Sequence, residues 1–175
     1  MTDYFDLGEY SRDVTPNSES QIWFDRAMVW LFAYNHEEAI KCFEKAIAAD
    51  TECAFAYWGV AYAVGPNYNK HWDVFTPKEK GPVLDKAHKF LQAGLALPSL
   101  SNLEKLLFEA LVQRYPQTPD IEDFQEYTDA FANAMTPVYR EYSDDLGVSA
   151  GGEISFVGPL TDDASSGVST DNTYT

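Results

Sequence analysis

The chain has few basic residues and only two cysteines. Lys and Arg number 12 against 28 Asp and Glu, which gives a formal net charge of -16 at pH 7. A surface of this sign repels phosphate backbones and anionic lipid headgroups, so we expect neither nucleic acid nor a membrane as partner. Cys42 and Cys53 are too few for a disulfide framework, and they favour a reducing, cytoplasmic setting.

Long apolar runs are also missing. No stretch approaches the roughly 20 apolar residues that a membrane-spanning helix needs. The first residues, Met-Thr-Asp-Tyr-Phe-Asp, have the features of neither a secretory signal nor a transit peptide. In contrast, hydrophobic residues make up 45% of the chain and aromatic residues 15%, which is enough to build the core of one folded domain.

Apolar residues recur at helical spacing through most of the sequence. On the first predicted helix Trp23, Ala27 and Trp30 lie on one stripe, and Phe24 and Met28 begin a second. A helix that is apolar on two sides must be covered on two sides. The pattern predicts helices over residues 20–34, 35–50, 53–64, 82–97, 102–115 and 120–142 of an all-α domain.

Three further segments have no helical period. Residues 1–18 are acidic and turn-rich, and we predict that they form an arm on the surface of the domain at 19–146. Residues 66–81 are predicted to be an irregular, aromatic insertion that closes at the helix start Thr76-Pro77. Residues 147–175 are rich in Gly, Ser and Thr without Lys or Arg, and they are predicted to be a disordered tail. Pro137 is expected to kink or break the last helix.

The apolar pattern repeats. Trp23 and Ala27 are followed 34 residues later by Tyr57 and Ala61, and 34 residues is the length of a tetratricopeptide unit. The small residues allow paired helices to approach closely. A second correspondence, of Ala39, Phe43, Ala46 and Ile47 with Ala87, Leu91, Gly94 and Leu95, has a spacing of 48 residues because the insertion intervenes.

Several short strings carry a resemblance to one family. They are Trp23-Phe24-Asp25-Arg26, Asn35-His36-Glu37-Glu38-Ala39, Cys53-Ala54, Tyr57-Trp58-Gly59-Val60-Ala61 and Gly65-Pro66-Asn67-Tyr68-Asn69. The chain resembles a subgroup of tetratricopeptide repeat (TPR) proteins of microbes and filamentous fungi, over roughly residues 4–146. This resemblance implies a short α-α superhelix of stacked antiparallel helix hairpins. It also implies a scaffold that binds a protein or peptide on the concave face of its first helices.

The repeat positions predict which side chains would line that concave groove. They are Gln21, Phe24, Met28, Leu31, Phe32, Phe55, Trp58 and Tyr62. Such a groove would be apolar and aromatic, suited to a hydrophobic peptide, a partner helix or a flat small molecule. The alternative is that these side chains are buried against the arm or neighbouring helices. Clamping of a C-terminal carboxylate is not expected, because the positions for Lys, Asn and Arg carry Phe24, Met28 and Phe32.

The insertion holds the best candidates for chemistry. Its loop carries Asn67, Asn69, Lys70, His71 and Trp72. If the protein were an enzyme or a small-molecule-binding accessory protein of a biosynthetic pathway, His71 would be the first candidate for a general acid or base. The alternative is a connecting loop whose Tyr68 and Trp72 fill a gap between repeats. The sequence has no catalytic motif, so the hypothesis leans away from an enzyme.

No cofactor or metal is expected. The candidate ligands His36, His71, His88, Cys42 and Cys53 lack the close paired spacing of zinc sites. We therefore predict a cytoplasmic protein-interaction scaffold. Self-association through the last helices, at Phe124, Phe131 and Tyr139, is a further hypothesis, because the open end of a helical stack exposes apolar surface.

Overall fold

The computed structural model describes residues 7–121 and 123–142, and this part of the chain is all-helical, as predicted. The helices are α1 (Ser18–Phe32), α2 (His36–Ala49), α3 (Ala54–Val64), α4 (Pro77–Leu95), α5 (Asn102–Val112) and α6 (Gln125–Glu141), with a single 3-10 turn, η1 (Trp72–Val74). None of the helices within these ranges is both long and apolar enough to cross a membrane. The predicted tail at 147–175 lies outside the described residues.

Side-chain caps fix where the helices begin. Asn17 accepts hydrogen bonds from the backbone amides of Glu19 and Ser20, each at 3.0 Å, and Asn35 caps α2 as the sequence predicts. Reciprocal capping boxes, in which the first residue and a glutamate three positions later bond to each other's backbone amides, start α4 and α5.

Two predicted boundaries are wrong. α4 begins at Pro77, not at residue 82, so the irregular insertion is limited to residues 66–76. The capping box of Thr76 and Glu79 starts the helix, which then continues through Pro82 although proline cannot donate a backbone hydrogen bond there. α6 begins at Gln125, later than predicted, and it runs through Pro137 to Glu141 without breaking.

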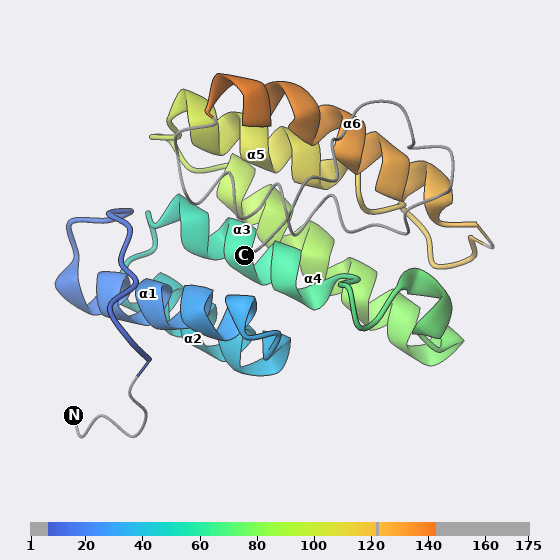
Figure 1. Ribbon diagram of the computed structural model, residues 1–175. Helices are drawn as coiled ribbons and strands as arrows, with labels where there is room; N and C mark the ends of the chain where they lie inside the picture. Colours follow the sequence, from blue (N-terminus) through green and yellow to red (C-terminus); the bar gives the residue numbers. More distant parts are fainter. Residues whose placement is uncertain (1–6, 122, 143–175) are drawn as a thin grey trace, which may run out of the picture.

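The helices pack in sequence order. Each helix contacts the next one along the chain. In addition, α3 contacts α1 on one side and α5 on the other. Figure 1 shows three successive helix pairs side by side in one row. The small residues predicted to allow close approach, Ala27, Ala46 and Ala61, are fully buried.

Most residues of the central helix α3 are buried. A β-carbon on Gly59 would lie 2.5 Å from the ring of Phe43 on α2, so only glycine allows this approach. On the other side of α3, the indole N–H of Trp58 donates to the carbonyl of Leu107 at 3.1 Å. The buried hydroxyl of Tyr115 donates to the carbonyl of Ala61 at 2.6 Å, and burial raises its pKa to about 12. These contacts tie the middle pair to both neighbours.

Candidate binding surface

Most of the side chains predicted to line an open groove are in the core. Their relative exposures are 2% for Phe24, 7% for Met28, 3% for Leu31, 9% for Trp58 and 2% for Tyr62. Helices α1 and α3 are covered on more than one side, so the repeat positions that would face a ligand face other parts of the chain. These five residues hold the helices together and do not form the predicted surface.

The other three predicted groove residues lie beneath the N-terminal arm. Gln21, Phe32 and Phe55 are half-buried, and each contacts a residue between positions 10 and 14. The arm, described from residue 7 to residue 17, has no helix or strand and crosses in front of α1 in Figure 1. The contacts place Tyr10 near the C-terminal end of α1 and Thr15 near its start, so the arm runs antiparallel to α1.

Two polar side chains of α1 bind the main chain of the arm. Gln21 donates from Nε2 to the carbonyl of Arg12 at 2.7 Å and accepts from the amide of Val14 at Oε1, at 3.0 Å. Asp25, one helical turn further on, accepts from the amide of Arg12 at 3.2 Å and from the hydroxyl of Ser11 at 2.7 Å. Gln21 also donates to Asp25 at 2.8 Å, which fixes both side chains. The arm is therefore bound as an extended peptide.

Aromatic rings receive two side chains of the arm. The guanidinium carbon of Arg12 lies 4.4 Å from the centroid of the Phe55 ring on α3. The ring of Tyr10 packs edge-on against Phe32 of α1, with centroids 5.6 Å apart. A cation over an aromatic face and an edge-to-face ring pair are both attractive beyond the area they bury.

The junction between arm and helix is held at α2. The hydroxyl of Thr15 donates to the Asp50 carboxylate, and it accepts from the amide of Asn17 at 3.1 Å. Asn17 donates to the carbonyl of Ala49 at 3.0 Å. Reasoning from the sequence missed Arg12, Asp25 and Asp50. The available signal was the pair Gln21 and Asp25, polar and one turn apart on a helix that is otherwise largely apolar.

Residues of the insertion are engaged in local structure. Asn67 accepts from the backbone amides of Asn69 and Lys70, closing a tight turn, and the Lys70 amine lies 2.7 Å from the Glu79 carboxylate. Asn69 is exposed. Trp72 is buried and stacked on Phe124, with centroids 4.5 Å apart.

His71 lies at the edge of this loop. Its ring is 6.5 Å from the exposed ring of Tyr68, measured between centroids. Trp72 fills the space between the α3–α4 loop and the last helix pair, as the alternative reading of the loop expected. Tyr68 does not fill it, because its side chain is 56% exposed.

The cysteines and histidines do not come together as a metal site in the described ranges. No cluster of three or more His, Cys, Asp or Glu side chains able to hold a metal ion occurs there. Burial raises the pKa of the Cys42 and Cys53 thiols, which keeps them protonated near neutral pH. Desolvation lowers the pKa of His36, and His88 contacts the carbonyl of Pro116 at 2.8 Å.

An arginine joins the insertion to the last two helices. The guanidinium carbon of Arg114 lies 4.8 Å from the centroid of the Tyr62 ring and 5.1 Å from that of Phe131. Its Nη2 donates to the carbonyl of Pro66. Because Arg114 is buried and its flat guanidinium contacts rings from α3 and α6, it acts as a cross-link in the core.

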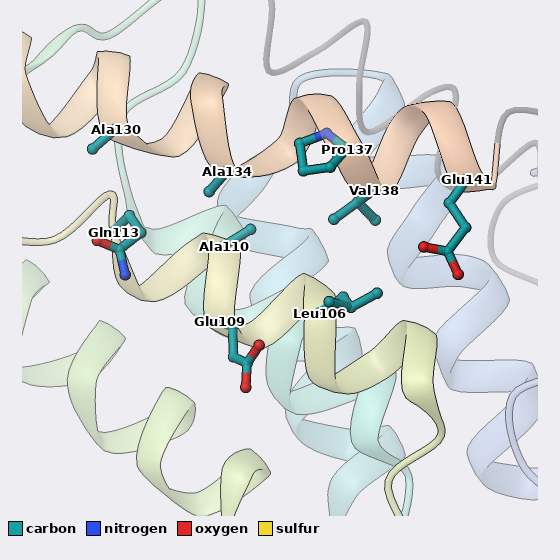
Figure 2. Close-up of a pocket in the computed structure, with 9 residues that line it drawn as sticks. All are labelled: Leu106, Glu109, Ala110, Gln113, Ala130, Ala134, Pro137, Val138 and Glu141. Atoms are coloured by element: carbon teal, nitrogen blue, oxygen red, sulfur yellow. The ribbon is translucent and has the colours of Figure 1, made fainter.

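A shallow hollow lies between α5 and α6 (Figure 2), with a volume of about 410 Å³. Its lining is Leu106, Glu109, Ala110, Gln113, Ala130, Ala134, Pro137, Val138 and Glu141. A second hollow of about 370 Å³ shares Gln113 and Ala130 with it and includes Glu126. The charged residues of both linings are glutamates, so this seam disfavours acidic ligands. Neither hollow includes a residue of the 66–72 loop.

Two of the three side chains considered for self-association are inaccessible. Phe131 is 2% exposed and Phe124 is 6% exposed, because Phe131 packs against Arg114 and Phe124 stacks on Trp72. Tyr139 is 37% exposed. The predicted aromatic surface on the last helices is therefore reduced to one residue.

No protein-family model, no curated protein and no solved structure matches the chain significantly.

Proposed function

We propose that the chain is an interaction scaffold of the tetratricopeptide type, and that it binds a segment of a partner protein in extended conformation across α1 and α3. We refer to this area as the α1–α3 face; it is formed by Gln21, Asp25, Phe32 and Phe55. The observation that carries the proposal is that this face already holds an extended segment, the arm, through that segment's main chain.

The order of packing supports the scaffold half of the proposal. Sequential helix pairs, with contacts among α1, α3 and α5 and buried small residues between them, are what stacked hairpins require. In such an array the first helix of each pair presents a common face. The arm crosses that face at α1 and α3.

The hydrogen bonds support the binding half. Donors and acceptors on Gln21 and Asp25 match the alternating N–H and C=O groups of an extended chain, and such main-chain bonds supply affinity for peptides of many sequences. The hydrogen bond from Gln21 to Asp25 holds both side chains in the orientation in which they bind the main chain of the arm.

The test is selection of peptides from a random display library on the full-length protein. With the arm weakened by Arg12→Ala, so that its own loss of the same bonds does not offset the effect, selected peptides should bind the protein that also carries Gln21→Ala at least about tenfold more weakly, since two main-chain hydrogen bonds are lost. The matched control is Ile22→Ala, because Ile22 neighbours Gln21 on α1 but is 55% exposed and away from the arm contacts. Selection of no peptide, or equal loss of binding in both variants, would contradict the proposal.

A further inference from the structure

The arm shows which side chains the α1–α3 face accepts. In an extended segment alternate side chains point to the same side, so Tyr10 and Arg12 project together. Tyr10 packs against Phe32 and Arg12 lies over Phe55, and these two rings belong to neighbouring helices. The face therefore has two side-chain sites, spaced for residues two positions apart.

The second of these sites is suited to arginine. The guanidinium carbon of Arg12 lies over the Phe55 ring, while Asp25 accepts from the backbone amide of the same residue and from the hydroxyl of the preceding Ser11. A flat guanidinium stacks on a ring while its N–H groups remain available, and a lysine ammonium cannot stack in this way. The surrounding charge, with 28 acidic against 12 basic residues in the chain, also attracts a cationic segment.

We infer that the α1–α3 face selects extended segments of other proteins that carry an aromatic residue followed two positions later by arginine, and that the arm competes with them for the same sites. This inference rests on the proposed function and adds the sequence class of the partner to it. Tyr10 and Arg12 stand in the arm where the partner's aromatic residue and arginine bind. The arm thus regulates access to the face.

Competition within one chain has a measurable consequence. A tethered segment has an effective concentration in the millimolar range when its linker is short. A peptide added from outside must displace it, so its apparent affinity falls by the ratio of covered to uncovered protein. Weakening the arm alone should therefore strengthen binding of an external peptide, although no residue of the face has changed.

The first experiment uses full-length protein and a fluorescent peptide with the sequence of residues 7–16, Leu-Gly-Glu-Tyr-Ser-Arg-Asp-Val-Thr-Pro. Full-length Arg12→Ala should bind the peptide about fivefold more tightly than the wild-type protein, because the arm loses its contact with Phe55 while the peptide retains its own. Asp13→Ala is the matched control, since Asp13 is the exposed neighbour of Arg12 and should leave affinity unchanged. Tighter binding to neither variant, or to both, would overturn competition by the arm.

The second experiment tests selectivity in the Arg12→Ala protein. Peptides with alanine in place of Tyr10 or Arg12 should bind about fivefold more weakly than the parent peptide, and a peptide with alanine in place of Asp13 should bind equally. Adding Phe55→Ala to the protein should abolish the difference between the arginine and alanine peptides. Circular dichroism of each variant confirms that its helices are formed.

The outcomes separate the two proposals. Peptides that bind through Gln21 but without preference for the aromatic and arginine positions would refute this inference and leave the proposed function standing. Loss of all peptide binding would refute both. A dimer in sedimentation, dissociated by the added peptide, would show that the occupant is the arm of a second copy and would overturn the inference of a different partner.

Discussion

The guanidinium of Arg12 lies over the ring of Phe55, with 4.4 Å between its central carbon and the ring centroid. This contact joins the first described segment of the chain to the third helix. Because the arm has no helix or strand of its own, its position depends on contacts of this kind and on the hydrogen bonds to Gln21 and Asp25.

Hydrogen exchange should detect those bonds. In the Gln21→Ala protein the Val14 amide loses its acceptor, so we expect its exchange to accelerate by about tenfold, while amides in the middle of α2 keep their protection. The measurement is amide exchange by NMR on the full-length protein. Ile22→Ala serves as control, and equal protection of Val14 in all three proteins would show that Gln21 does not hold the arm.

Gly59 should not tolerate a methyl group. In Gly59→Ala the new β-carbon would lie 2.5 Å from the ring of Phe43, which is fully buried and would have to shift. We expect a loss of about 1–3 kcal/mol in the free energy of unfolding, measured by urea denaturation. Gly81→Ala is the matched control, because Gly81 is also helical but has nothing within 4 Å of the added carbon. There alanine should stabilise by about 0.5–1 kcal/mol.

Trp58 should behave as a core residue and not as a ligand-binding one. Trp58→Ala removes its stack on Tyr62, at 4.9 Å between centroids, and its hydrogen bond to Leu107, so we expect a loss of about 3–5 kcal/mol of stability. Trp58→Phe retains the ring and should cost less. Thermal unfolding followed by circular dichroism measures both. An unchanged melting temperature for Trp58→Ala would place this side chain on an open surface instead.

Glu79 should make the start of α4 sensitive to acid. The hydrogen bond from Lys70, with those from the amide and hydroxyl of Thr76, lowers the pKa of Glu79 from 4.5 to about 2. A carboxyl group with a lowered pKa stabilises the folded state above its unfolded pKa, and this contribution is lost as the pH falls from about 4.5 to 2. The melting temperature of the wild-type protein should decrease over this range more steeply than that of Glu79→Gln. Parallel curves would mean that the bond to Lys70 does not persist in solution.

Local signals made much of the fold predictable. Asn35 with Glu38, and Ser101 with Glu104, mark helix starts that the structure contains. The helix start at Thr76-Pro77 was also recognised, but the prediction began the following helix only at residue 82, whereas α4 runs from Pro77 through Pro82 without interruption. Whether a helix continues through such a proline depends on the packing of the whole helix, which neighbouring residues in the sequence do not reveal.

The candidate surface was only partly predictable. Repeat positions indicate which side chains of α1 and α3 point away from the partner helix, and they led to Gln21, Phe32 and Phe55. They do not indicate that Phe24, Trp58 and Tyr62 are covered, because the residues that cover them come from distant parts of the chain. The role of Arg12 also depends on a long-range contact, for which a single sequence carries no periodic signal.

Asn17 lies at the boundary between the arm and the folded helices. Its own side chain caps α1 and its Nδ2 bonds to the end of α2, so these capping bonds do not come from the part of the arm that carries Tyr10 and Arg12. Detachment of the arm consequently has the energetic character of ligand dissociation and not of partial unfolding. We therefore expect substitutions at Tyr10 and Arg12 to change the occupancy of the binding face while the helices remain folded.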